Sequence, residues 1–223
     1  MELLDNPAWH SLERQSPFAE TVAEARRYHP EVNQIAALPD QASPASWAAL
    51  RPLIRDGEAV HMLRLSAEVP DDWSIAHRGT VVQMVGAAPP PAFEEIRFLE
   101  LTDDDAPEML ALALATRPGP FAARTHQLGQ FIGIREGGRL IAMAGERLVL
   151  PGMTEVSAVC TDPEHRGRGL AAALTAEIAR RIWARDETPF LHVVEANTTA
   201  RRVYERIGFQ DRVILTHVLV SPR

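Results

Sequence analysis

The sequence predicts an α/β protein built on a mixed sheet with helices on its faces. Three observations support this fold class. After residue 95, strand-like and helix-like patterns alternate along the chain. Residues 131–150 have the pattern of a β-hairpin, because Gly137 and Gly138 stand between two apolar runs. Beyond Gly169, apolar side chains recur every four residues, which predicts a long amphipathic helix.

Local patterns place each element of this C-terminal part. An acidic stretch at 103–105 suits the positive end of a helix dipole and predicts a helix over 103–115. Gly208 is expected to end a second helix, because glycine adopts the left-handed conformation that caps helix C-termini. The expected strands are 95–101, 131–135, 140–150, 155–161, 190–195 and 213–220, and the remaining helices begin near 169 and span 198–207.

A proline-rich stretch divides the sequence into two predicted domains. Residues 89–94 include three consecutive prolines, which enter neither a helix nor a central strand and favour an extended linker. Residues 1–88 are expected to form an N-terminal α/β unit with strands at 60–65 and 80–85, and residues 95–223 the second domain. The N-terminal unit contains no catalytic motif and is expected to complete the acceptor pocket or only to stabilise the fold.

Composition excludes several classes of function. The 223 residues carry a formal charge of −7, which argues against nucleic-acid binding. No apolar run is long enough to span a membrane and no signal stretch begins the chain, so a cytoplasmic protein without a membrane partner is expected. The single Cys160 excludes an internal disulfide, and no cysteine–histidine cluster suggests a metal. All basic residues are arginine, which excludes Walker A and Schiff-base chemistry.

The segment 156–172 carries the main chemical signal. It has the pattern strand, turn, helix, with Gly167 and Gly169 at the turn and Arg166 and Arg168 beside them. Free N–H groups at a helix start bind anions, and glycines let the backbone approach phosphate oxygens. The segment therefore predicts a pyrophosphate site, with a glycine-containing helix start of no further function as the alternative.

A dinucleotide fingerprint is a competing interpretation of the same residues. Gly167, Gly169 and Ala172 match its spacing loosely, and Glu195 lies downstream at a strand end. However, five residues separate the strand from the first glycine, where the fingerprint requires almost none. The chain after the motif is also too short for a doubly wound domain.

The same residues resemble the GNAT acyltransferases. The central GNAT motif is Gln or Arg, two residues, Gly, one residue, then Gly or Ala, and residues 166–171 match it at every position. A second motif places Asn, Ala and Tyr on a helix that ends in Gly-Phe, as Asn197, Ala200, Tyr204 and residues 208–209 do here. The resemblance covers residues 95–223 and implies a mostly antiparallel sheet. The earlier half is similar to the degenerate N-terminal half of the glycine N-acyltransferase-like branch. One departure is that only one strand follows Phe209, where the family has two.

The resemblance also implies which residues bind the acyl donor, acetyl-CoA, with no metal. Backbone groups at the end of strand 155–161 would hold the thioester, and the loop amides with the flanking arginines would hold the pyrophosphate. The implied cofactor-binding residues are Val159, Cys160, Thr161, Arg166, Gly167, Arg168, Gly169, Leu170, Ala171 and Asn197.

The expected reaction is transfer of an acetyl group to a primary amine of a small molecule or amino acid. Glu155 is the predicted base, because alternation places it with Ser157 and Val159 on one strand face, and Glu146 is the alternative base on that face. Tyr204 is the predicted acid for the departing thiolate. A peptide acetyltransferase and a non-catalytic acyl-CoA sensor remain alternatives, and a homodimer stays open.

The other conspicuous residues have open roles. Cys160 is expected to be a small buried apolar side chain rather than an acyl carrier. His165 adjoins the phosphate loop and either contacts phosphate or faces solvent. His126 and His192 have no partner that the sequence identifies. The loop 117–126 occupies the place where GNAT proteins shape the acceptor pocket, and a plain connection is the alternative.

Overall fold

The computed structural model describes residues 2–223. Its N-terminal segment forms a small antiparallel sheet in the order β1-β2-β3, accompanied by two short helices. The serine before the second helix caps it, since the Ser43 side chain accepts a hydrogen bond from Ser46 N and the Ser46 side chain accepts one from Ser43 N. These elements are α1 (Pro7–Arg14), β1 (Ala19–Val22), β2 (Ala25–Tyr28), β3 (Ala36–Ala37) and α2 (Pro44–Leu50).

A single eight-stranded sheet forms the rest of the framework, in the order β4-β11-β5-β10-β9-β8-β7-β6. All neighbours pair antiparallel except β9 and β10. The predicted mixed, mostly antiparallel sheet flanked by helices is confirmed. Its strands are β4 (Val60–Arg64), β5 (Trp73–Gly86), β6 (Leu99–Glu100), β7 (Phe131–Glu136), β8 (Arg139–Leu150), β9 (Met153–Thr161), β10 (Thr188–Val194) and β11 (Phe209–Pro222).

Strand β5 comes from the N-terminal half and lies between β10 and β11. It pairs with β10 from Val81 to Val85 and with β11 along almost its whole length, from Trp73 to Gly86. The strand that the family resemblance requires beside the last one is therefore supplied from upstream of the proline-rich stretch. The large sheet contains strands from both sides of the linker expected at 89–94, so the two halves of the chain share one sheet.

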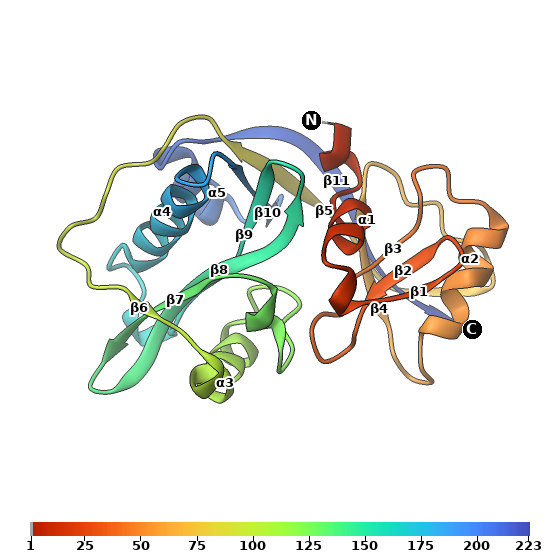
Figure 1. Ribbon diagram of the computed structural model, residues 1–223, viewed down its shortest axis with the longest axis horizontal. Helices are drawn as coiled ribbons and strands as arrows, with labels where there is room; N and C mark the ends of the chain where they lie inside the picture. The colour runs from red at the N-terminus through yellow and green to blue at the C-terminus, as the bar shows by residue number, and fades with distance from the viewer. Residues whose placement is uncertain (1) are drawn as a thin grey trace.

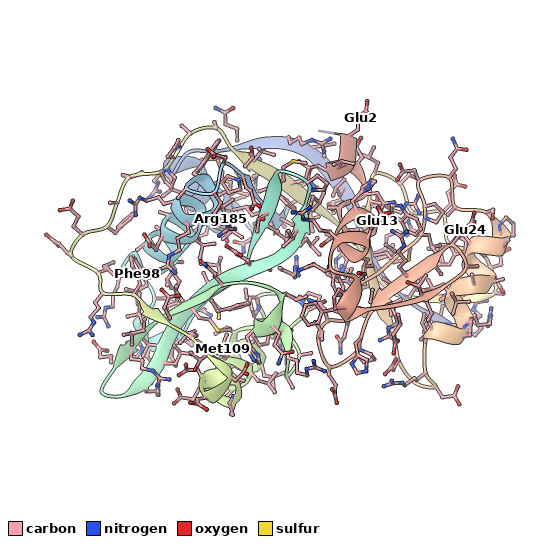
Figure 2. The ribbon with its side chains drawn as sticks, in the orientation of Figure 1. Glu2, Glu13, Glu24, Phe98, Met109 and Arg185 are labelled. Atoms are coloured by element: carbon pink, nitrogen blue, oxygen red, sulfur yellow. The ribbon has the colours of Figure 1, made fainter. Side chains whose placement is uncertain are left out.

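Helices cover both faces of the large sheet. α4 (Leu170–Trp183) and α5 (Thr198–Arg206) lie on one side, and α3 (Ala106–Thr116) lies on the other (Figure 1). Leu174 and Ile178 of α4 pack with Val82 and Val156, and Met109 of α3 packs with residues of β7 and β8. Figure 2 shows Met109 and Arg185 on opposite sides of β8. α1 lies between the two sheets and packs against β8.

Three expected strands differ in length from those observed by more than two residues. The strand expected at 95–101 is reduced to Leu99–Glu100, because the chain before it runs irregularly and packs Phe93, Ile96 and Phe98 onto the α4 core. β5 and β11 are longer than expected, since their polar residues pair with each other without apolar alternation. Among residues 2–223, no helix combines the length and apolar character needed to cross a bilayer.

Candidate active site

The central feature of the site is a gap between two neighbouring strands. β9 and β10 pair in parallel only from Thr188↔Met153 to Phe190↔Glu155. β9 then continues to Thr161 and β10 to Val194 without pairing to each other. Backbone N–H and C=O groups along this opening are therefore available to a ligand. Val159, Cys160 and Thr161, the predicted thioester contacts, line the end of β9 at this opening.

A β-bulge turns the side chains of β9 at this place. Ala158 has φ of 53°, and the register to β8 shifts between Met143 and Gly145. Because the bulge adds one residue, Ala158 and Cys160 both pack on the α3 side, while Val159 packs on the α4 side with Val156. The expectation that Val159 shares a face with Glu155 is wrong, because strict alternation ends at the bulge. The bulge brings Val159 to the same apolar cluster as Tyr204.

Glu155 lies at the point where the two strands part and is completely buried. Arg147 donates two hydrogen bonds to its carboxylate, Nε to Oε2 at 2.8 Å and Nη2 to Oε1 at 2.7 Å. His192 Nδ1 lies 2.6 Å from Oε1. Burial alone would raise the pKa of Glu155, but the charge and hydrogen bonds of Arg147 and the contact with His192 overcome it and lower that pKa to about 2.

The neighbours of His192 hold its ring in place. Its Nε2 lies 3.0 Å from Gln83 Nε2, which also donates to Leu4 O, while Gln83 Oε1 accepts from Arg212. The Gln83 amide therefore donates to Nε2, which leaves the ring proton on Nδ1, facing Glu155. Glu155, Arg147 and His192 therefore form a satisfied buried network.

Glu146, the alternative base, lies on the other face of the sheet. Its Oε1 is 2.9 Å from Arg185 Nη2, just beyond α4, and Gln130 N donates to its Oε2 at 3.3 Å. A second register shift, between Glu146 and Val149, pairs Glu146 with Val156 and so places it on the face that Val156 occupies. The expectation that Glu146 shares the face of Glu155 is wrong for the same reason as for Val159: bulges interrupt alternation on both strands.

The predicted phosphate loop begins α4. Gly167 and Gly169 have φ of 78° and 77°, in the left-handed region that favours glycine, and Gly169 is the N-cap residue of the helix. A Cβ at either position would meet no atom within 4 Å, so the space above the loop is open. The first N–H groups of α4 have no partner within the helix and point to this space. Leu170 and Ala171 thus lie where a phosphate site requires them.

The two arginines of the loop differ in their partners. Arg168 donates to both carboxylate oxygens of Glu136, at 3.1 and 3.2 Å, at the turn between β7 and β8. Arg166 is exposed, and its Nε lies 3.4 Å from Thr161 O at the end of β9. His165 also contacts Glu136, because its Nε2 lies 2.8 Å from Glu136 Oε2. Arg166 therefore lies between the loop and the end of β9, where the gap between the strands opens.

Helix α5 forms the other border of the gap. The Asn197 side chain caps it by accepting from Ala200 N at 3.1 Å. Tyr204 packs edge-on against Phe209, with ring centroids 6.4 Å apart, and lies on the apolar cluster that includes Val159. Burial raises the pKa of Tyr204 to about 12. The phenol therefore keeps its proton at neutral pH and is a potential donor.

Two further expectations have a clear structural outcome. Cys160 is buried under α3, and burial raises the pKa of its thiol to about 11, so its sulfur is protonated and faces away from the α4 side. The loop 117–126 contacts the N-terminal segment, where Arg124 N donates to Glu31 O and Thr125 Oγ1 donates to Val32 O. The loop thus joins the two halves beside α3.

Comparisons with known proteins assign the family. The family model described as FR47-like protein matches residues 131–218. A crystal structure of a GNAT-family acetyltransferase from Novosphingobium aromaticivorans is 38% identical, with coverage of 99% of this chain and 98% of that one and a TM-score of 0.91. This chain belongs to the GNAT family.

Two curated GNAT relatives match shorter stretches. Mycothiol acetyltransferase of Mycobacterium avium is 39% identical over 95 residues, which cover 38% of this chain and 30% of that protein. N-alpha-acetyltransferase RimI of Mycobacterium tuberculosis is 34% identical over 100 residues, which cover 42% of this chain and 62% of that protein. The chain thus spans less than two thirds of each of these curated relatives.

Sequence reasoning missed three residues of the candidate site. Gln83, Arg147 and His192 complete the network around Glu155, and each is a polar residue inside an otherwise apolar strand pattern. That pattern was the available signal, because a buried polar side chain requires a partner. The identity of the partner depends on which strands are neighbours, and β5 reaches β10 from the other half of the chain.

The Glu155–Arg147 pair predicts a large loss of stability when one partner is removed. Arg147→Met should lower the free energy of unfolding by about 3–5 kcal/mol, because a buried carboxylate loses its cation. The double variant Arg147→Met, Glu155→Gln should lose less, since no charge stays unpaired. Urea unfolding measures both. Arg180→Met, which breaks an exposed pair with Glu177 on α4, is the control and should cost less than about 1 kcal/mol. Equal losses for all three variants would contradict the buried-pair account.

Proposed function

We propose that this chain transfers an acetyl group from acetyl-CoA to a primary amine of a small molecule or amino acid. The observation that carries the proposal is the gap between β9 and β10, which opens beside the unpaired N–H groups at the start of α4. A thioester and a pyrophosphate on one ligand require these two features side by side. We also propose that the N-terminal half is similar to the degenerate N-terminal half of the glycine N-acyltransferase-like branch. In this proposal residues 1–88 and 95–223 are two units, and residues 89–94 join them.

The residues of the chain fit acetyl-CoA as acyl donor. Gly167 and Gly169 leave open space where phosphate oxygens would approach, and Arg166 is an exposed cation beside it. The free backbone groups of β9 near Val159 would accept the pantetheine chain and polarise the thioester carbonyl. Asn197 and Tyr204 border the same gap from α5.

The reaction needs two proton movements. The amine nitrogen forms a bond to the acetyl carbon, the carbon–sulfur bond breaks, and the nitrogen loses its proton. In the proposed mechanism Tyr204 O–H donates a proton to the departing CoA thiolate. The high pKa of Tyr204 keeps that proton available until the thiolate forms.

The proposed role of Glu155 as base requires an intermediary. Its carboxylate is buried and accepts from Arg147 and His192, so it does not touch solvent. A proton taken from the amine would have to reach it through water or through His192, and the low pKa of Glu155 makes it a weak acceptor. Glu155→Gln distinguishes the roles. If Glu155 is the base, Glu155→Gln should abolish the acidic limb of the pH profile of kcat. If Glu155 only positions other groups, the variant should change kcat and leave that limb in place.

The acyl-donor site yields a direct prediction. Arg166→Glu should weaken acetyl-CoA binding by about 10- to 150-fold, the equivalent of roughly 1.5–3 kcal/mol, because repulsion replaces a charge-assisted bond. Gly169→Val should weaken it too, by filling the space above the loop and straining a left-handed residue. Isothermal titration calorimetry with acetyl-CoA measures both, and Arg180→Glu on the exposed side of α4 is the charge-matched control. Unchanged affinity in both loop variants would place the donor site elsewhere.

A peptide N-terminus is the second candidate acceptor, favoured by the match to N-alpha-acetyltransferase RimI. A panel of amino acids, polyamines, aminoglycosides and short peptides, assayed for CoA release, separates the two. Release with small amines supports the proposal, and release with peptides alone supports the second candidate. A thermal shift with acetyl-CoA but no release on any amine would instead indicate a non-catalytic sensor.

A further inference from the structure

Arg147 has one edge of its guanidinium group that makes no hydrogen bond to the protein. An arginine guanidinium carries five N–H groups in a planar fork. Two of them, on Nε and Nη2, donate to the Glu155 carboxylate at 2.8 and 2.7 Å. The outer edge, formed by Nη1 and the second N–H of Nη2, has no acceptor among residues 2–223, although the side chain is only 9% exposed. We call it the free edge of Arg147.

The free edge faces the loop that follows α3. A Cβ built at Gly119 would lie 3.9 Å from Arg147 Nη1, and beyond the adjacent residues no other atom would lie within 4 Å of it. Gly119 is exposed and has φ of 137°, in the region that favours glycine. Nη1 itself is not sealed from solvent. The chain therefore leaves room for a small group between Gly119 and the guanidinium.

Polar side chains of α1 and the residue after it hold the strand that carries Arg147. Gln15 Nε2 donates to Arg147 O at 3.1 Å, and Val149 N donates to Ser11 Oγ at 2.8 Å. Both bonds satisfy backbone groups beside the second register shift between β8 and β9, where the ladder is interrupted. The N-terminal segment thus fixes the part of β8 from which the Arg147 side chain extends.

The free edge lies on the face of the sheet opposite α4. Val193 packs in the α4 core, so alternation points His192 to the other face, where it contacts Glu155. Glu155 lies where β9 and β10 part, and Arg147 is paired with it on this face. The acyl donor is proposed to reach the gap from the start of α4. The opposite face, with the free edge, is therefore left for the acceptor.

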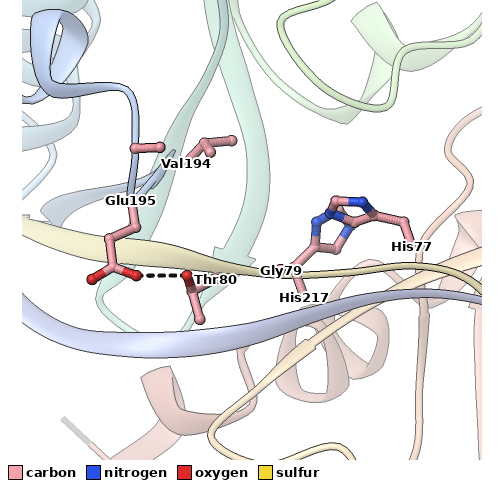
Figure 3. Close-up of a pocket in the computed structure, with 7 residues that line it drawn as sticks. His77, Gly79, Thr80, Val194, Glu195 and His217 are labelled. Carbon is pink, nitrogen blue, oxygen red and sulfur yellow. Dashed lines mark hydrogen bonds between the residues drawn. The ribbon is translucent and has the colours of Figure 1, made fainter.

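Imidazoles further along this face do not compete with Arg147 for an anion. The register of β5 and β11 places His217 on the same face, and Figure 3 shows it beside His77. His217 Nε2 lies 2.8 Å from His61 Nδ1, so at most one proton lies between these two nitrogens. Burial, followed by the charges of His77, Arg147 and His192, lowers the pKa of His217 to about 4. Because His217 is uncharged at neutral pH, a carboxylate on this face is drawn to Arg147.

We propose that the free edge of Arg147 binds the carboxylate of the acceptor, so that the acceptor is a small amino acid whose amine is held at the gap between β9 and β10. A guanidinium edge and a carboxylate match in shape and form two parallel charge-assisted hydrogen bonds. Glu155 tolerates the second carboxylate, because Arg147 lies between the two anions and His192 also contacts Glu155. The inference rests on the proposed acetyltransferase function and names its substrate class.

The kinetic test compares an amino acid with its own amide, which lacks the carboxylate. With saturating acetyl-CoA, CoA release is measured for alanine and alaninamide, and for β-alanine and β-alaninamide. The full-length parent should prefer the acid in kcat/KM by about 10-fold or more in at least one pair, since a charge-assisted bond contributes that much. Arg147→Lys keeps a cation for Glu155 but has no second edge, so the acid-to-amide ratio should fall to about one. An effect of this variant through Glu155 acts on both acceptors and cancels in the ratio.

A second variant tests the space in front of the free edge. Gly119→Leu places a side chain there and leaves the Arg147–Glu155 pair intact, so it should also lower the acid-to-amide ratio. Gly57→Leu, at another exposed glycine with a positive φ of 81°, is its matched control and should keep the parental ratio. Arg180→Lys, on the exposed side of α4, is the control for Arg147→Lys.

A binding measurement separates this inference from the function on which it rests. The Nε–H resonance of Arg147, assigned by its loss in Arg147→Lys, is followed by NMR as alanine or β-alanine is added to the complete protein. Saturable shifts that the amides do not cause support the carboxylate site, even if no amine releases CoA and the transferase proposal fails. CoA release with an unchanged acid-to-amide ratio in Arg147→Lys and Gly119→Leu overturns the inference and leaves the function standing. Equal kcat/KM for acid and amide in the parent, or equal shifts with both, also overturns it.

Discussion

A chain reduced to residues 92–223 is expected to lose its cooperative fold. β5 pairs with both β10 and β11, so its removal leaves the facing edges of two strands without hydrogen bonds. β11 then loses every neighbour, because its other partner, β4, is removed as well. Removal of α1 also uncovers the buried side chains of Leu148, Leu150 and Phe190. Because a domain is stable by only roughly 5–15 kcal/mol, we expect these losses together to unfold it.

Thermal unfolding followed by circular dichroism, together with acetyl-CoA binding, tests this expectation. The truncated chain should show no cooperative transition and no binding. As a control, the complete protein is cut by a protease site placed within 89–94, which removes the connection but keeps β5. The two fragments should stay associated and retain binding. A truncated chain that unfolds cooperatively with parental acetyl-CoA affinity would show that the N-terminal strands are dispensable.

Tyr204→Phe is expected to reduce turnover by about 10²- to 10⁴-fold, the range for loss of a general acid. The ring remains and still packs against Phe209, so acetyl-CoA binding and stability should change little. Steady-state and single-turnover kinetics at saturating substrates measure the effect on the chemical step.

The other tyrosine supplies the matched control. Tyr28→Phe removes the same atom from a buried cluster, where the hydroxyl donates to Gln15 Oε1 at 2.6 Å and contacts Ser11. This variant should lose about 1–3 kcal/mol of stability, because buried partners remain unsatisfied, with turnover at the parental level. Parental turnover in Tyr204→Phe, with chemistry limiting, would remove this phenol from the mechanism.

The elements that the sequence predicted well depend on neighbouring residues. α4 follows from its apolar spacing. α5 ends at Arg206, and Gly208 follows its C-cap residue with a φ of 97°, as expected of a glycine after a helix. The β7–β8 hairpin follows from Gly137 and Gly138 between apolar runs. In each case the information lies within one turn or one strand.

The features that the sequence did not predict depend on distant partners. β5 lies between β10 and β11 and pairs with residues more than a hundred positions away in the sequence. The pattern of a strand's own residues does not indicate which distant strand it pairs with. The bulge at Ala158 places an ordinary residue in the left-handed region, without the glycine or asparagine that usually indicates it. Because this bulge decides which face each later residue of β9 occupies, the expected grouping of Glu155 with Val159 failed.

The buried network shows the same limit. Arg147 and Glu155 are close in sequence, but register shifts between β8 and β9 decide that they meet, and β5 brings Gln83 to His192. The carboxylate predicted to act as base, that of Glu155, is held as a buried anion. Roles assigned by residue type thus require the register of every neighbouring strand.

The most direct test of acetyl transfer to an amine uses acetyl-CoA labelled with carbon-13 in the acetyl group. The complete protein is incubated with this donor and, in turn, with each amine and peptide of the panel, and the products are identified by mass spectrometry and NMR. The account predicts the label in an amide of one of these amines, with free CoA formed in equal amount and formation slowed in Tyr204→Phe. Label that stays in acetyl-CoA, or appears only as acetate, with every amine and peptide of the panel would contradict it.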